Sequence, residues 1–264
     1  MLEELLKKIL NEYYLIDVIK IEKSIESTIG NVHIVYTKEK KYILKIYEDL
    51  SHVTSMILLH DDLINKINIP KVIKNKKNSG YSILEDNKYV VLYSFLDGVQ
   101  IGKEFNKLSN DIVKQLATEI RYLHNLTSNK NKYNLKEIPF CKNKTDRKSL
   151  LHFDLTKNNI FFNKENEKLG FIDFDDAKYG PSICDVAITI CLLFISKKRG
   201  IDTKAIQLFI NSYYNNDIEL KEKEIKCINE FVTNWVDYVL KENEFDTSLR
   251  DSFEFKKIQI QKYM

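Results

Sequence analysis

The chain has 264 residues, of which 44% are hydrophobic and 30% charged, values typical of a globular protein and not of a disordered or membrane-embedded one. The formal net charge is only +3, which argues against nucleic acid as the leading partner. The longest apolar run, residues 186–195, is about half the length that spans a bilayer, so no membrane partner is expected.

The first third of the chain predicts mainly strands. The N-terminal segment MLEELLKKILNEYY has the spacing of an amphipathic surface helix and does not resemble a signal peptide. A second helix is predicted at residues 53–67, ending before Pro70. Short β-branched segments with a period of two predict strands at residues 18–25, 32–37, 42–47, 81–85 and 89–95.

After Gly98 the periodicity becomes helical. A helix is predicted to begin near Ser109 or Asn110, and others at about 182–197, 202–214, 221–243 and from 248 onward. A strand-rich part is therefore joined to a helix-rich part at YSFLDG, residues 93–98. This organisation predicts an α+β fold with two lobes, whose junction is a natural place for a ligand.

Residues 149–177 carry polar side chains within hydrophobic segments. NIFF and KLGFIDF predict a β-hairpin centred on Asn166, which would place Asn159 opposite Asp173. Their oxygen atoms suit Mg²⁺, with water and phosphate completing the coordination. Asp154 lies in the loop that leads to the same end. Phosphoryl transfer demands alignment more than a strong base, so an ordinary carboxylate suffices there.

The pattern HxDxxxxN, followed by IDF, resembles the catalytic and metal loops of the kinase-like fold. The closest resemblance is to the aminoglycoside phosphotransferase and choline kinase family, whose IDFxxxxxGxPxxDxA segment is similar to FIDFDDAKYGPSICDVA here. The resemblance implies a bilobal protein-kinase-like fold, with an N-lobe at residues 1–96 and a C-lobe at 97–264. It also implies Asp154 as catalytic base, Asn159 and Asp173 as Mg²⁺ ligands, and structural support from His152 and Asp185.

The same resemblance implies a nucleotide site in the N-lobe. Lys45, in KYILKIY, would hold the nucleotide phosphates. The loop in ESTIGNVHIVY would face them through Ser27, Thr28 and Gly30, and the hinge in VVLYSFLDG would meet the adenine edge through the Ser94 carbonyl and the Leu96 N–H.

The expected function is phosphoryl transfer from ATP or GTP, with Mg²⁺, to a hydroxyl of a small molecule. The cysteines form no CxxC pair, and this pattern favours a location in the reducing cytoplasm. Two alternatives stay open. The first is a catalytically weak or inactive nucleotide-binding protein. It is motivated by the helix SHVTSMILLHDDLINKI, which has the apolar Met56 and Ile57 where kinases carry a glutamate. A protein Ser/Thr kinase is the other alternative. Asp175 could assist a second Mg²⁺, contact substrate or face solvent.

Overall fold

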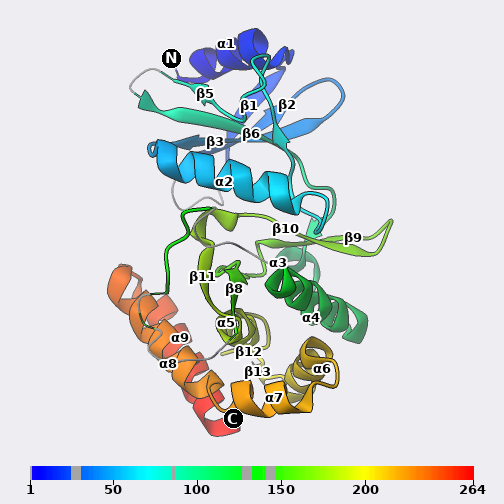
Figure 1. Ribbon diagram of the computed structural model, residues 1–264, viewed down its shortest axis with the longest axis vertical. Coiled ribbons are helices and arrows are strands. Elements are labelled where there is room, and N and C mark those ends of the chain that lie inside the picture. Colours follow the sequence, from blue (N-terminus) through cyan, green and yellow to red (C-terminus); the bar gives the residue numbers. More distant parts are fainter. Residues whose placement is uncertain (1, 25–30, 85–86, 127–132, 139, 141–146) are drawn as a thin grey trace. The chain divides into compact units, whose positions relative to one another are not determined.

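The computed structural model describes residues 2–24, 31–84, 87–126, 133–138, 140 and 147–264. The chain forms two compact units, one of Met1–Asp97 with Lys132–Asn134 and the other of Gly98–Asn131 with Leu135–Met264. The first unit holds one large sheet, and the second is mainly helical (Figure 1).

The sheet of the first unit is antiparallel throughout, with the order β1-β2-β3-β6-β4 and β5 also paired to β6. The predicted strands are present, and all are shorter than predicted except β3, which begins one residue earlier; β4 was not predicted because it has only Val72 and Ile73. The strands are β1 (Lys20–Lys23), β2 (Val32–Tyr36), β3 (Lys41–Tyr47), β4 (Val72–Ile73), β5 (Ser82–Ile83) and β6 (Tyr89–Ser94).

Helices α1 (Leu2–Tyr14) and α2 (Leu50–Leu63) cover opposite faces of this sheet (Figure 1). Because side chains alternate along β3, Leu44 packs in the cluster that includes α1, whereas Lys45 lies on the other face with Ile43. Helix α2 begins earlier than predicted because the Asp49 carboxylate caps it, accepting a hydrogen bond of 2.8 Å from the Ser51 N–H.

The second unit surrounds small sheets with helices, and α8 lies along α9 (Figure 1). Strands pair in the orders β10-β9-β7, β11-β8 and β12-β13. The strands are β7 (Val99–Gln100), β8 (Lys148–Leu151), β9 (Ile160–Asn163), β10 (Lys168–Phe171), β11 (Lys178–Pro181), β12 (Ile195–Ser196) and β13 (Gly200–Ile201). The helices are α3 (Ile101–Glu104), α4 (Asn110–Asn125), the short 3₁₀ helix η3 (Phe174–Asp176), α5 (Ile183–Leu193), α6 (Thr203–Tyr214), α7 (Ile218–Ile225), α8 (Ile228–Glu242) and α9 (Thr247–Tyr263).

Several predicted helix boundaries need correction. Helix α4 begins where expected, because the Ser109 hydroxyl accepts a hydrogen bond from the Ile112 N–H. The predicted helix 221–243 is two helices, since the chain turns after α7, where the Cys227 N–H bonds to the Glu224 carbonyl. The predicted helix 182–197 ends at Leu193 because the following residues enter the β12–β13 hairpin.

The predicted hairpin that follows Asn159 is present, but its predicted register is wrong by one residue. Phe171 pairs with Ile160, and the Ile172 N–H donates to the Asn159 carbonyl at 3.0 Å, so Asn159 faces Ile172 and not Asp173. The turn occupies residues 164–167, and its centre therefore falls before Asn166.

No helix in the described part of the chain combines the length and apolar character needed to cross a bilayer.

Candidate active site

Asp154 and Asn159 are joined directly by hydrogen bonds. The Asn159 side-chain amide donates to the Asp154 carboxylate at 2.7 Å and to the Asp154 backbone carbonyl at 2.9 Å. The turn between them is closed by the Asn159 N–H, which donates to the Thr156 carbonyl at 3.1 Å. The loop therefore fixes the direction of the Asp154 carboxylate relative to the Asn159 amide.

Asp173 follows the hairpin in a left-handed conformation, with φ 68° and ψ 64°. A residue in this conformation leaves the alternation of the strand, so the local turn, and not strand register, sets the direction of its side chain. The turn leads directly into η3, which carries Asp175 and the exposed Asp176.

Asp185 binds the backbone just before Asp154. Its Oδ2 accepts a hydrogen bond of 2.7 Å from the His152 N–H, and its Oδ1 accepts one of 2.9 Å from the Phe153 N–H. Asp185 is fully buried at the start of α5. A buried carboxylate needs such donors, and each of these belongs to the backbone just before Asp154.

His152 is bound on several sides and is fully buried. Its Nε2 lies 2.9 Å from the Ile172 carbonyl, and its Nδ1 accepts a hydrogen bond of 3.3 Å from the Asp154 N–H. The ring also packs 4.4 Å from the Phe174 ring, centroid to centroid. The imidazole thus connects the Asp154 loop to the residue before Asp173.

The surroundings of Asp154 oppose its ionisation. Burial raises the pKa of the Asp154 carboxyl above its usual range. His152 and the Asn159 hydrogen bond act in the opposite direction, whereas the negative charges of Asp176 and Asp173 raise the pKa further. Asp173 and Asp176 therefore both lie near enough to Asp154 to influence its carboxyl.

The donor set fits a hard cation. Since the Asn159 N–H groups point at Asp154, its amide oxygen is turned away from that carboxylate, and amide and carboxylate oxygens such as those of Asn159 and Asp173 are the kind of ligand that Mg²⁺ prefers. Among the described residues, no group of three His, Cys, Asp or Glu side chains is arranged to hold a metal ion. A Mg²⁺ ion would therefore depend on the Asn159 amide and on water or phosphate oxygens as well.

The predicted nucleotide residues lie in the first unit where the structure describes them. Lys45 is half-buried on β3, with its ammonium 6.0 Å from the centre of the Tyr93 ring. Ser94 ends β6, where its N–H and hydroxyl bond to the backbone of Lys71, and Leu96 is buried. Ser27, Thr28 and Gly30 lie outside the described residues.

The acidic residues near α2 have contacts of their own. Glu48 lies 3.6 Å from the Lys88 ammonium, Asp61 lies 3.4 Å from that of Lys74, and Asp62 accepts a hydrogen bond from the Tyr133 hydroxyl. Met56 is buried, so the apolar character of this helix position is part of the core packing of the unit.

Two residues beside the loop were missed by sequence reasoning. Asp176 is exposed, but its charge raises the pKa of the Asp154 carboxyl. Lys178 places its ammonium 5.8 Å from the centre of the Phe153 ring and 3.9 Å from the Asp176 carboxylate. Their place in the quoted motif FDDAKYG was the only available signal, because burial and proximity are tertiary properties.

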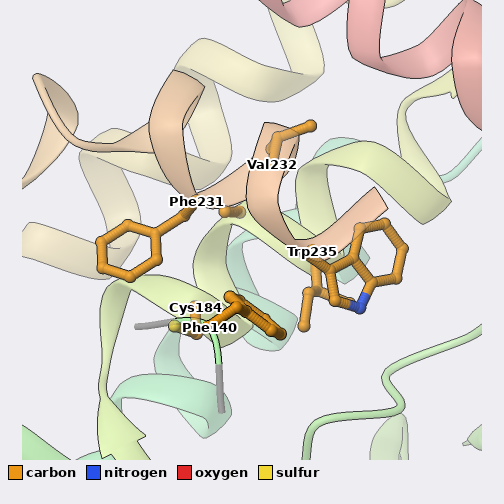
Figure 2. Close-up of a pocket in the computed structure, with 7 residues that line it drawn as sticks. Phe140, Cys184, Phe231, Val232 and Trp235 are labelled. Carbon is orange, nitrogen blue, oxygen red and sulfur yellow. The ribbon is translucent and has the colours of Figure 1, made fainter. Parts of the chain in front are cut away.

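The aromatic residues of the C-terminal helices belong mainly to the core. Tyr213, Tyr214 and Trp235 are at most 6% exposed and are therefore core residues. Figure 2 shows Trp235 and Phe231 of α8 beside Cys184, around a small apolar pocket. This pocket adjoins α5, the helix that carries Asp185.

Comparison with known proteins agrees with this geometry. A family described as "Phosphotransferase enzyme family" matches residues 135–202, which include the Asp154 loop, the hairpin and Asp185. No curated protein sequence matches the chain significantly.

Three solved structures illustrate the structural likeness. A spectinomycin phosphotransferase in complex with ADP and spectinomycin is 16% identical, with 98% of this chain and 96% of that chain covered and a TM-score of 0.66. An amicoumacin kinase in complex with AMP-PNP, Ca²⁺ and Ami is 13% identical, with 99% of this chain and 94% of that chain covered and a TM-score of 0.69. The choline kinase of Streptococcus pneumoniae is 12% identical, with 99% of both chains covered and a TM-score of 0.62.

The predicted fold and the predicted resemblance are therefore confirmed. The chain has the α+β, protein-kinase-like fold of these phosphotransferases over nearly its full length. The family match coincides with the segment whose motifs carried the resemblance.

Proposed function

We propose that this protein transfers the γ-phosphate of ATP or GTP to a hydroxyl group of a small molecule. The observation that carries the proposal is the direct bond between Asp154 and Asn159, on a loop whose backbone is held by Asp185. This arrangement orients one carboxylate and one amide oxygen in different directions from the same turn.

In this mechanism Asp154 aligns the acceptor hydroxyl and takes its proton. The Asn159 amide N–H holds the Asp154 carboxylate in place. The Asn159 amide oxygen and the Asp173 carboxylate would hold Mg²⁺. Mg²⁺, when bound, supplies positive charge to the transferring phosphate. Because the transition state is loose, alignment by Asp154 contributes more than its strength as a base.

The nucleotide assignment is supported by the ligands named for similar structures, which include ADP and AMP-PNP. In the first unit, Lys45 is the residue proposed to contact the nucleotide phosphates, and Ser94 and Leu96 are proposed to meet the base. Ser27, Thr28 and Gly30 are proposed as the phosphate loop. Asp175 remains a candidate for a second metal ion or for substrate.

A small-molecule acceptor is favoured over a protein acceptor by the short path after Asp173. Only η3 and β11 lie between Asp173 and the start of α5 at Ile183, which leaves no room for a long activation segment. The similar structures also carry small-molecule names: spectinomycin, amicoumacin and choline.

The decisive test is the substitution Asp154→Asn. We expect the rate of phosphate transfer to a panel of small hydroxyl compounds to fall by about 10²–10⁴-fold. Binding of ATP with Mg²⁺ should be retained, because Asn keeps the size of the side chain. Binding would be measured as a thermal shift. Transfer would be measured from radiolabelled nucleotide.

Asp176→Asn is the matched control, since it removes a neighbouring carboxylate from η3 without removing the proposed base. Full activity of Asp154→Asn would refute the assignment of the base. Tight nucleotide binding by the unmodified protein without transfer to any acceptor would instead support the inactive nucleotide-binding alternative, and label transferred to protein would support a protein kinase.

A further inference from the structure

A chain of polar side chains extends from Asp185 to Arg147. Oδ2 of Asp185 lies 3.2 Å from Nε2 of His124, and Nδ1 of His124 lies 2.7 Å from the Tyr213 hydroxyl. Arg147 donates to that hydroxyl at 2.9 Å. Asp185 and Tyr213 are fully buried and His124 is 5% exposed, so water cannot replace these partners easily.

The chemistry of arginine gives this chain a direction. A guanidinium has donors only, so the Tyr213 oxygen must accept from Arg147 and its own proton is left to donate to Nδ1 of His124. An accepting Nδ1 places the proton of a neutral imidazole on Nε2, which faces Asp185. Every bond then points from Arg147 toward Asp185.

This direction matters for the loop because Asp185 can only accept. With His124 donating to its Oδ2, both carboxylate oxygens stay directed at the donors, including the His152 and Phe153 N–H groups. Phe153 has φ 67°, a conformation that a bulky residue adopts only when its surroundings impose it. The residue that follows it is Asp154.

We propose that Arg147 and Tyr213 are positioning residues for the Asp154 loop, acting through a one-way chain of hydrogen bonds that fixes His124 in its Nε2–H form. The inference rests on the proposed function for its effect on rate, but the form of His124 is a property of the folded protein alone. Neither residue was identified by the sequence motifs.

The first test is ¹⁵N NMR of the histidine side chains in the full-length protein, with the His124 signals assigned by their loss in His124→Gln. We expect a neutral ring with the proton on Nε2, and a changed Nδ1 signal in Tyr213→Phe. Ser182 also approaches the Tyr213 hydroxyl. If Tyr213 donated to Ser182 instead, His124 would carry protons on both ring nitrogens. Protons on both nitrogens at pH 8, or a proton on Nδ1 alone, would overturn the proposal.

The second test is a double-mutant cycle of phosphate transfer, measured well below the melting temperature of each variant. Arg147→Met and Tyr213→Phe should each lower kcat by about tenfold, while KM for MgATP is unchanged, because only the orientation of the loop is disturbed. Since Arg147 acts through the hydroxyl, the double variant should be no slower than Tyr213→Phe alone.

Arg147→Lys, which still donates, should recover most of the rate. Arg121→Met, which removes an arginine of α4 outside this chain, is the control and should keep the full rate. Independent, multiplicative losses in the double variant, or full activity of Arg147→Met, would overturn the positioning role. Failure of phosphate transfer in the unmodified protein would contradict the proposed function instead, and the NMR test would still decide the form of His124.

Discussion

Glu224 is a buried carboxyl remote in sequence from the Asp154 loop. Its Oε2 accepts a hydrogen bond of 2.8 Å from the Tyr214 hydroxyl, and its Oε1 has no hydrogen-bond partner among the described residues. Burial raises the pKa of Glu224, against the lowering effects of the Tyr214 bond and of Arg147. The folded state therefore binds this proton more tightly than the unfolded chain.

A pH dependence of stability follows from that sign. The contribution of Glu224 is most favourable below the unfolded pKa of about 4.3 and is lost as pH rises through the higher folded pKa. Glu224→Gln keeps an acceptor for Tyr214 but cannot ionise. We expect the variant to lack this loss and to be more stable than the unmodified protein at pH 7, by about 1 kcal/mol.

Urea unfolding between pH 4.5 and pH 8 measures this difference. Glu222→Gln, an exposed position on the same helix, is the control and should follow the unmodified protein. A difference between Glu224→Gln and the unmodified protein that does not grow with pH would show that the Glu224 pKa is not raised in the folded state.

At the scale of elements, the residues around the start of α3 brace the Asp154 loop. The Gly102 N–H donates to the Lys157 carbonyl at 3.0 Å, and the Gln100 amide donates to the Asn158 carbonyl at 3.0 Å. A Cβ added at Gly102 would lie 2.8 Å from the Lys157 Cβ and 3.0 Å from the Asn158 Oδ1. The Lys157 Cβ is bonded directly to the loop backbone, so relief of this overlap would shift the segment between Asp154 and Asn159.

Gly102→Ala is therefore predicted to disturb both stability and rate. We expect the free energy of unfolding to fall by about 1–3 kcal/mol from overpacking and kcat to fall with it. Chemical denaturation and phosphate transfer would be measured on the same sample. In the control Gly180→Ala the atoms nearest to the new Cβ belong to the side chains of Ile138 and Leu151 and not to Lys157 or Asn158, so a smaller effect on kcat is expected. Equal effects in both variants would contradict the bracing role.

At the scale of the whole molecule, Lys45 and Asp173 are both proposed to act on the nucleotide, directly or through its metal ion. If both act on the nucleotide, Lys45→Met and Asp173→Ala should each abolish the stabilisation given by MgATP. For the unmodified protein, a ligand at 100 times its Kd contributes about 2.7 kcal/mol, or roughly 5–10 °C in Tm for a chain of this size.

Differential scanning fluorimetry with and without MgATP measures this shift. Lys41→Met, an exposed lysine on the same strand as Lys45, is the control and should keep the shift. A full Tm shift with MgATP in Lys45→Met would show that Lys45 is not needed for nucleotide binding. A full shift in Asp173→Ala would contradict the assignment of Asp173 as a metal ligand.

Features that depend on neighbouring residues were predictable from the sequence. Periodicity predicted the helices and strands, and the Ser109 cap predicted the start of α4, because both arise within a few residues of the chain. The turn that joins Asp154 to Asn159 is equally local, since the bonded residues are five positions apart. The spacing of one short motif therefore determined the core of the candidate site.

Features that depend on packing were decided only by the tertiary structure. The hairpin register followed from how the turn at 164–167 closed, which placed Ile172 and not Asp173 opposite Asn159. The connection of His124, Tyr213 and Arg147 to Asp185 joins segments up to 89 positions apart. Burial and partner choice arise when distant segments pack together, so no local pattern in the sequence could specify them.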